Sequence, residues 1–134
     1  LDRREGALPR MVLPYKLFGG GTIGKGEQWL SWIHIDDVCR MIRFAIEHEI
    51  IEGVMNVTAP NPVKMKEFGK TIANVLNRPH WLPVPSFALK ILLGEMNLLV
   101  LEGQRVLPKK AQQHGFQFRY EHLYDALEHI LKNT

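Results

Sequence analysis

Apolar residues recur along the chain with two different spacings, and the change between them separates helices from strands. Residues 6–18 carry apolar positions at mixed helical spacing, with Pro9 near the start and Pro14 inside, which predicts a short or kinked helix. Residues 29–35 are rich in aromatic and β-branched side chains and predict a strand. The chain is therefore expected to open with a helix and to continue, after a run of glycines, into a strand.

A second amphipathic helix is expected directly after this strand. Apolar residues at positions 38, 41, 42, 45 and 46 have the spacing of one buried helical face. Asp36 and Asp37 stand where an aspartate can cap the first turn, and the helix is expected to continue to about His48. Cys39 falls in the same apolar pattern, so we expect it to be a core residue and not a catalytic thiol.

The rest of the chain alternates between the same two kinds of pattern. The expected elements are a strand at 54–58, a helix at 68–76, apolar helices at 87–93 and 96–101, a strand at 116–120 and a last helix at 123–131. Strands joined by helices normally belong to parallel sheets covered on both faces. Three short strands make a poor sheet alone, so we predict a helix-rich α/β chain with an incomplete sheet, in which residues 54–58 complete a larger one.

Length and composition limit the classes of protein that remain. The chain has 134 residues, enough for one compact core, and its 46% apolar and 23% charged residues are typical of globular proteins. Seventeen basic and fourteen acidic residues are scattered, which gives no basic face for nucleic acid. The apolar stretch at 87–101 is interrupted by polar residues and is shorter than the ~20 residues of a membrane span. A lone cysteine suits the reducing cytoplasm, where we expect the protein to be.

A run of glycines between the first helix and the first strand imitates a nucleotide-binding motif. Residues 19–24 fit the spacing G-x-G-x-x-G, and residues 19–25 come close to a P-loop, although Gly26 replaces the Ser or Thr that binds magnesium. Both motifs work only between a strand and a following helix, because the helix N-terminus supplies the N–H groups that hold phosphate. Since the order here is reversed, we expect a flexible surface loop.

The strand at 29–35 supplies the first candidates for a ligand site. Gln28 precedes it with an amide that would be costly to bury without a partner, and Trp29 and Trp32 have flat rings that can stack on a ligand or pack in a core. His34 lies at the carboxyl end of the strand, where open α/β proteins place their ligands. A buried, hydrogen-bonded histidine is the structural alternative for His34.

Further along, Gln104 and Arg105 form a second candidate group. A guanidinium binds phosphate or carboxylate with two parallel hydrogen bonds, so Arg105 is a sensible anion contact, with a solvated helix end as its alternative. The six histidines lack the spacing of metal ligands, which gives no expectation of a metal site. Spacing alone also assembles no nucleophile with its base, so no catalytic residue is assigned to this chain.

Several short stretches together resemble the C-terminal part of a bacterial epimerase family whose last section is called DUF1731. The stretches are GALPRM (6–11), GEQWLSWIHIDD (26–37), NVTAPNPV (56–63), LPVP (82–85), LLGEM (92–96), QRVLP (104–108) and GFQFRY (115–120). The resemblance covers essentially all 134 residues, with the DUF1731-like section at about 82–131. It identifies the chain as similar to NAD(P)-dependent short-chain dehydrogenase/reductases of the extended or atypical type.

The resemblance implies a parent protein that begins with a Rossmann domain, which binds NAD(P) and carries the catalytic tyrosine of the superfamily. The chain opens at Leu1 without an initiator Met or signal peptide, which agrees with a start inside a longer polypeptide. Residues 1–134 would then be the substrate-binding portion, for a sugar nucleotide or related small molecule. Related epimerases often carry an arginine for the substrate's pyrophosphate where this chain has Leu30, and Arg105 is a candidate to replace it.

A different class of protein is compatible with the same residues. A small α/β binding or regulatory module without redox chemistry would also lack cofactor motifs. The length of the parent protein distinguishes the two, because only the enzyme requires a long N-terminal extension. The oligomeric state is not indicated by any pattern in the sequence.

Overall fold

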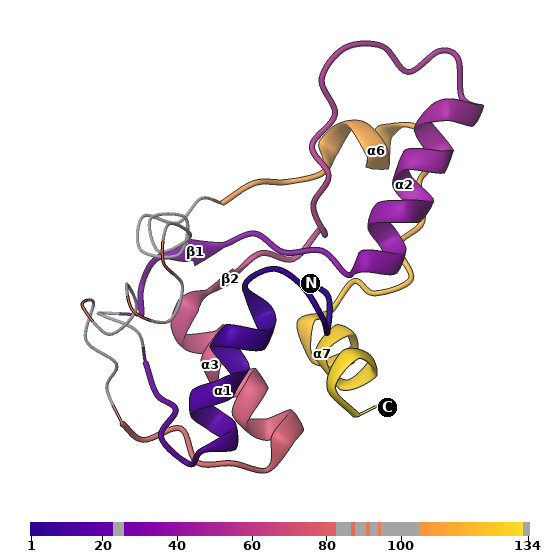
Figure 1. Ribbon diagram of the computed structural model, residues 1–134. Helices are drawn as coiled ribbons and strands as arrows, with labels where there is room; N and C mark the ends of the chain where they lie inside the picture. The colour runs from indigo at the N-terminus through magenta and orange to yellow at the C-terminus, as the bar shows by residue number, and fades with distance from the viewer. Residues whose placement is uncertain (23–25, 83–86, 88–90, 92–93, 95–104, 133–134) are drawn as a thin grey trace.

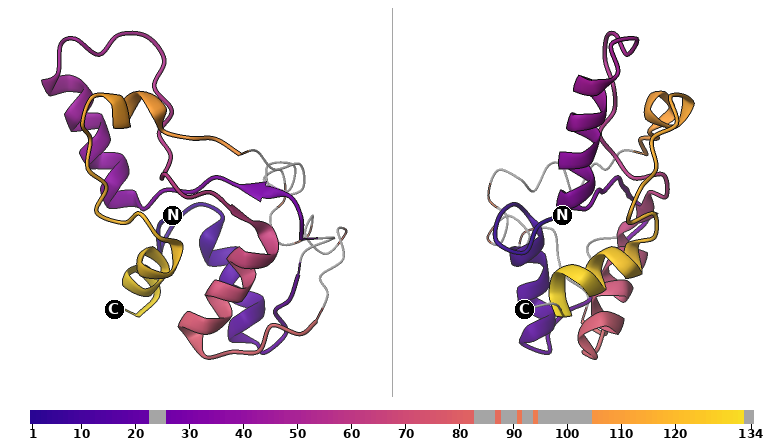
Figure 2. Two further views of the ribbon diagram at one scale, coloured as in Figure 1. Left: turned by 180° about the vertical axis from the view of Figure 1, so that it is seen from behind. Right: turned by 90° about the vertical axis from the view of Figure 1, so that its right-hand side faces the viewer.

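A computed structural model describes residues 1–22, 26–82, 87, 91, 94 and 105–132, and its elements form two lobes (Figure 1). Three helices pack together in the first lobe, and two helices lie in the second. The first lobe contains α1 (Leu8–Lys16), α3 (Met65–Leu76) and α7 (Leu123–Lys132), and the second contains α2 (Ile35–Glu47) and α6 (Lys109–Gln113). We call them the three-helix lobe and the α2 lobe. Figure 2 shows that α2 and α6 extend away from the other three helices.

α1 is the short helix that its proline pattern predicts. Pro9 lies in its first turn, where a missing N–H costs nothing, and Pro14 lies inside the last turns. Leu8, Met11, Val12 and Tyr15 are buried at the spacing of one helical face. The helix ends at Lys16, and Phe18 then adopts a positive φ of 63°.

α3 is the central helix of the three-helix lobe, because it contacts α1, α7 and both strands. Its buried residues include Phe68, Ile72 and Val75, as the apolar pattern predicts. Asn77 ends it in the left-handed conformation, which asparagine tolerates better than most residues. The predicted helix at 68–76 is therefore confirmed, with a start three residues earlier, and the predicted helix at 123–131 corresponds to α7.

The sheet is smaller than the sequence predicts, and its strands are antiparallel. It contains β1 (Trp29–Leu30) and β2 (Val63–Lys64), with Trp29 opposite Lys64 and Leu30 opposite Val63. The helix-rich α/β class is confirmed, but the parallel arrangement inferred from the helical connections is wrong for this pair. Only the first two residues of the expected strand at 29–35 are paired, since the chain beyond Leu30 turns into α2.

Two other expected strands are absent from the described part of the chain. Residues 54–58 form no ladder. At their end, the Trp32 carbonyl accepts one bond from the Ala59 N–H (2.7 Å) and one from the Thr58 side-chain hydroxyl (3.4 Å). Residues 116–120 form none either, because their final N–H groups donate to a carboxylate on α2 instead of to a strand. Strand-type side chains do not make a strand without a partner for the backbone.

The apolar face predicted for α2 is only partly covered. Met41 is fully buried, but Ile42 is 51% exposed and Ile46 is 75% exposed. Cys39 is exposed too, so the core role expected for it is wrong. The reason is the small core of this lobe, in which the buried residues Met41, Ala111 and Phe116 pack with a few partly buried neighbours such as Phe44. The isoleucines point away from that core.

The two expected helices at 87–93 and 96–101 lie largely outside the described residues. Within the described part of the chain, no helix is both long and apolar enough to cross a bilayer.

Gly69 permits the close approach of α1 and α3, which gives a prediction for stability. A Cβ at this position would lie 2.4 Å from the Tyr15 hydroxyl and 2.8 Å from His80 Cε1. We expect Gly69→Ala to destabilise the full-length protein by about 1–3 kcal/mol, because the packed helices must separate. Thermal or urea unfolding measures the change. Lys70→Ala is the control, since Lys70 is exposed on the same helix; an equal loss in both variants would contradict the packing explanation.

Candidate functional site

The glycine run does not have the surroundings of a phosphate loop. α1 precedes it and β1 follows it, in the reverse of the required order. The expected surface loop is nevertheless wrong for Gly20 and Gly21, which are buried. A Cβ on Gly20 would lie 2.2 Å from the Tyr15 ring, and the Gly20 carbonyl accepts bonds from the N–H groups of residues 81 and 82. These glycines serve close packing.

A partly buried network missed by the sequence analysis holds this run in place. The Tyr15 hydroxyl donates to the Gly21 carbonyl (3.2 Å) and lies 2.9 Å from His80 Nδ1, and Thr22 Oγ1 lies 3.0 Å from His80 Nε2. Burial raises the pKa of Tyr15 to about 12 and lowers the pKa of His80. Both side chains are therefore neutral at pH 7. No sequence motif links Tyr15 to a histidine 65 residues away.

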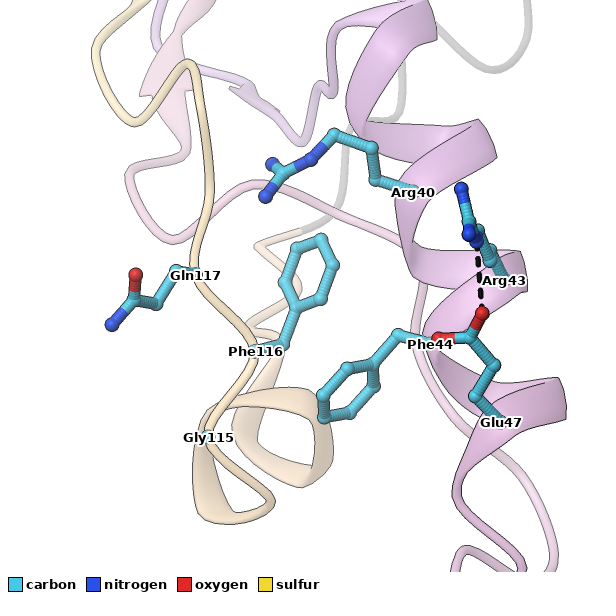
Figure 3. A pocket seen from close by; sticks show the side chains of 7 residues that line it. All are labelled: Arg40, Arg43, Phe44, Glu47, Gly115, Phe116 and Gln117. Carbon is cyan, nitrogen blue, oxygen red and sulfur yellow. Dashed lines mark hydrogen bonds and ion pairs between the residues drawn. The ribbon is translucent and has the colours of Figure 1, made fainter.

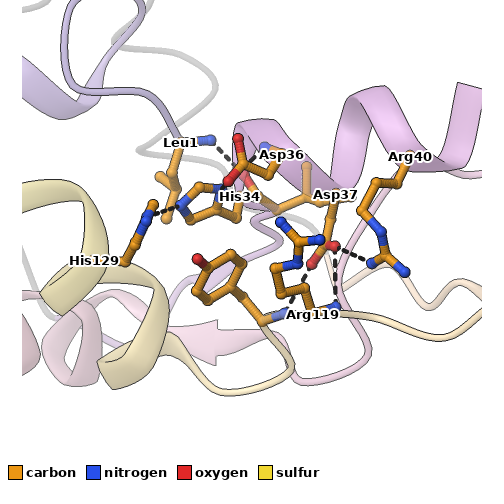
Figure 4. Close-up of polar contacts among 9 residues, drawn as sticks. Leu1, His34, Asp36, Asp37, Arg40, Arg119 and His129 are labelled. Atoms are coloured by element: carbon orange, nitrogen blue, oxygen red, sulfur yellow. Dashed lines mark hydrogen bonds and ion pairs between the residues drawn. The ribbon is translucent and has the colours of Figure 1, made fainter.

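His34 begins α2, and its ring connects the two lobes (Figure 4). Its Nδ1 accepts a hydrogen bond from the Asp36 N–H (3.0 Å), so His34 and not an aspartate is the N-cap. Its Nε2 lies 3.0 Å from Nδ1 of His129 on α7, and its ring stacks on Tyr120 at 4.0 Å. His34 is 1% exposed, as the alternative of a buried, hydrogen-bonded histidine expects.

These hydrogen bonds fix the tautomers of the two histidines. A backbone N–H can only donate, so Nδ1 of His34 has no proton and Nε2 carries it. Nε2–H then donates to Nδ1 of His129. His34, Asp36 and His129 offer ligand atoms within 4.8 Å of one another, but both nitrogens of His34 are already engaged. A metal on His34 would break the cap of α2 or the bond to α7.

Asp37 makes the second connection at the start of α2. Its carboxylate is fully buried and accepts three bonds, from Arg40 Nη1 (2.8 Å), the Arg119 N–H (3.0 Å) and the Tyr120 N–H (2.9 Å) (Figure 4). A buried carboxylate requires such partners, because its desolvation is costly. The expected capping role of the paired aspartates is thus corrected, since Asp37 holds a distant segment of the chain.

The candidates Trp29 and Arg105 lie together at the edge of the sheet. The Arg105 guanidinium is 5.3 Å from the centre of the Trp29 ring, and Lys64 Nζ is 5.7 Å from it. Both distances are within the range of a cation–π interaction. The Val106 N–H donates to Ser31 Oγ (2.8 Å), which fixes the backbone beside Arg105. Gln28, the residue before Trp29, has its carbonyl bound by the Met65 N–H.

The other candidates do not join this group. Trp32 is 3% exposed and its indole N–H donates to the Asn61 carbonyl (2.8 Å), so it packs in the core. Gln104 lies outside the described residues. Sequence reasoning did not identify Lys64 or Glu27, which bind each other at 2.9 Å beside Trp29. Lys64 could have been identified by its position opposite Trp29 in the sheet, but the sequence does not show which residues of the two strands pair.

A shallow pocket of about 360 Å³ lies elsewhere, in the α2 lobe (Figure 3). None of the predicted site residues lines it. Its lining residues are Arg40, Arg43, Phe44, Glu47, Gly115, Phe116 and Gln117. The two arginines are paired internally, Arg40 with Asp37 and Arg43 with Glu47, which leaves little net charge for a ligand.

Comparison with solved structures defines the class of protein. The described fold matches the human epimerase family protein SDR39U1 (isoform 2), solved with NADPH, with a TM-score of 0.90 and 36% identity over all of this chain and 46% of that one. A nucleoside-diphosphate sugar epimerase from Corynebacterium glutamicum matches with a TM-score of 0.72 and 33% identity over 98% of this chain and 24% of that one. The fold is that of the C-terminal part of a short-chain dehydrogenase/reductase-like epimerase.

Sequence comparison then gives the family. Residues 84–130 match the domain of unknown function DUF1731. The epimerase family protein YfhF of Bacillus subtilis is 62% identical over 95% of this chain, and the chloroplastic SDR39U1 homolog of Arabidopsis thaliana is 48% identical over 98%. The chain belongs to this DUF1731-containing epimerase family and corresponds to its C-terminal part. It spans 42% of the length of YfhF and 38% of the Arabidopsis protein.

The buried ring of His34 predicts how stability depends on pH. Burial lowers the pKa of His34 in the folded protein, partly opposed by the Asp36 charge, whereas the unfolded value is about 6.5. Below that value the unfolded chain binds more protons, so stability should be full above pH ~6.5 and fall as the pH decreases toward the lowered pKa. Urea unfolding of the full-length protein between about pH 5 and 8, the range in which histidine titrates, measures this.

His34→Gln should be less stable at pH 8 and should lose part of this pH dependence, since the buried titrating group is gone. His122→Gln is the matched control, because His122 is exposed and at the start of α7. If His34→Gln keeps the same pH slope as the original protein and the control, the buried imidazole does not cause it.

Proposed function

We propose that this chain is the substrate-side portion of an NAD(P)-dependent epimerase or oxidoreductase that acts on a sugar nucleotide or related small molecule. The observation that supports this most is the match over the whole chain to an epimerase family protein solved with NADPH. The portion of the relatives that this chain does not cover would bind the dinucleotide and carry the catalytic residues. Hydride transfer is the chemistry of the nicotinamide, and the protein orients the substrate and excludes water.

Within this proposal, Trp29 and Arg105 form the part of the substrate site that the described residues supply. They come from β1 and from the segment after residue 104, so two separate backbone segments position them. An aromatic ring beside a guanidinium suits a ligand that has both a flat or apolar part and an anionic part. Gln28 and Gln104 flank the two residues in the sequence and extend the same proposed site. We place the protein in the cytoplasm.

The uncovered face of α2 supports a contact with the dinucleotide-binding portion. Ile42 and Ile46 are exposed on α2, and Val54 is 87% exposed in the segment that follows it. Strand-like residues 54–58 have no ladder partner among the described residues. A sheet in the portion outside this chain would cover these apolar side chains and would provide the missing strand partner, as α/β layers normally do.

Titration with NADPH and NADH tests the proposed function. We expect the full-length protein to bind at least one of them in a saturable way, with energy transfer from tryptophan to the nicotinamide as the signal. Residues 1–134 alone should show negligible affinity, since the dinucleotide site would lie outside them. No binding by the full-length protein, or equally tight binding by residues 1–134, would contradict the assignment.

A substitution on α2 tests the proposed contact between the two portions. Ile46→Asp should lower the stability of the full-length protein by roughly 1–3 kcal/mol, because it buries an unpaired charge in an apolar interface. Leu17→Asp is the matched control, because Leu17 is 70% exposed but lies at the end of α1 in the other lobe. Unfolding in urea compares them. A loss no larger than that of Leu17→Asp would show that this face of α2 stays in solvent.

A further inference from the structure

Two cations lie over one aromatic ring at the edge of the sheet. Lys64 is opposite Trp29 in the antiparallel register, and its Nζ is 5.7 Å from the centre of the indole. Arg105 reaches the same ring from a third segment, at 5.3 Å. The ring attracts both cations and so helps to restrict two long side chains. β1 contains only Trp29 and Leu30 and therefore has no charged residue of its own. Pairing with β2 places the charge of Lys64 beside Trp29.

The charges around this ring do not balance. Glu27 binds Lys64 (2.9 Å) and Lys66 (2.8 Å), so one carboxylate serves two ammonium groups. Hydrogen bonds from Lys66 and Lys64 lower the pKa of Glu27 to about 2, so it is ionised at neutral pH. Among the residues that the structure describes, no carboxylate lies within ion-pair distance of Arg105. Glu67 also acts on Lys66, so the excess positive charge lies at the ring itself, where Lys64 shares Glu27 and Arg105 lies over the same indole. Two like charges this close favour an additional anionic group.

We propose that Lys64 and Arg105, held over Trp29, bind a phosphate or diphosphate group of a ligand, and that Glu27 competes with this group for Lys64. The proposal rests on the proposed function and specifies the chemistry of its ligand. Arg105 contributes a guanidinium whose donors match phosphate oxygens, and Lys64 contributes a compact charge. When no ligand is bound, Glu27 forms an ion pair with Lys64. When a ligand binds, Lys64 would pair with the phosphate instead, and Glu27 would keep its ion pair with Lys66.

Because Glu27 competes with the ligand for Lys64, the proposal predicts that loss of Glu27 strengthens anion binding. If pyrophosphate bound elsewhere on the protein, away from Lys64, removal of Glu27 would leave its affinity unchanged. Removal of a competitor should tighten binding. Glu27 is exposed, and its ion pairs with described residues are those to the two lysines, so Glu27→Gln should not disturb the core.

The experiment is isothermal titration of the full-length protein with inorganic pyrophosphate. We expect Lys64→Gln and Arg105→Gln each to weaken binding by about tenfold, as loss of a charge-assisted bond does. Glu27→Gln should strengthen it by roughly threefold, since Lys64 is then released. Arg43→Gln is the control with the same loss of charge, because Arg43 pairs with Glu47 on α2. It should bind pyrophosphate like the original protein. Thermal unfolding checks that every variant is folded.

Two results would overturn the proposal. One is unchanged or weaker pyrophosphate binding by Glu27→Gln. The other is equal loss of affinity in Arg43→Gln and Lys64→Gln, which would indicate a general effect of charge. If Lys64→Gln fails to fold, Glu27→Gln alone still decides, because it predicts a gain. Absence of pyrophosphate binding by a protein that binds NADPH would reject this site and leave the proposed function standing, whereas loss of both would reject the proposed function.

A competition experiment identifies the source of the phosphate. If saturating NADPH prevents pyrophosphate binding, the group belongs to the cofactor. If pyrophosphate binds equally well beside NADPH, the group belongs to the substrate, and uridine diphosphate should displace it. Both results support the site, and they assign it to different ligands.

Discussion

The buried carboxylate of Asp37 determines how the two lobes are joined. It lies in the first turn of α2 and accepts the N–H groups of Arg119 and Tyr120, which lead into α7. The positive end of the helix dipole favours an anion at this place. A carboxylate shielded from water must keep its donors or pay a large desolvation cost, so the segment before α7 has little freedom to move away. The neighbouring His34 repeats the connection through His129.

The position of α7 follows from this attachment. α7 packs along α3, and its buried residues Leu123, Leu127 and Ile130 belong to the core cluster that contains Phe68. The same segment carries Phe116 into the α2 lobe, where Arg40 lies 5.3 Å from its ring. Arg40 thus binds both Asp37 and Phe116. The segment from Phe116 to Tyr120 thus contributes Phe116 to the core of the α2 lobe and leads into α7, which packs in the three-helix lobe. The bonds from the Arg119 and Tyr120 N–H groups to Asp37 fix where this segment lies along α2.

The helices α1, α2, α3 and α7 were predicted from the sequence, whereas the short α6 was missed and the strands were mostly wrong, for a physical reason. The bonds of α1, α3 and α7 are local, so the spacing of apolar residues along the chain is enough to find them. A strand depends on a partner that can lie anywhere. Residues 54–58 and 116–120 have the composition of strands, yet the first has no partner within the described residues and the second donates to Asp37. The burial predicted for the apolar face of α2 was wrong for a similar reason. The spacing of apolar residues shows which side of a helix is apolar, but it does not show which element covers that side.

In the candidate site, too, the sequence indicated suitable residue types but not where the fold places them. Trp29 and Trp32 look equivalent in the sequence, but the ladder ends at Leu30 and the chain then turns into the core. Trp32 satisfies its indole N–H with a backbone carbonyl, whereas Trp29 remains at the sheet edge with two cations. Lys64 became visible only with the register, because 35 residues separate it from Trp29. Residue type alone therefore does not separate the two tryptophans. Their positions differ because cross-strand pairing with β2 places the charge of Lys64 beside Trp29, whereas Trp32 packs in the core.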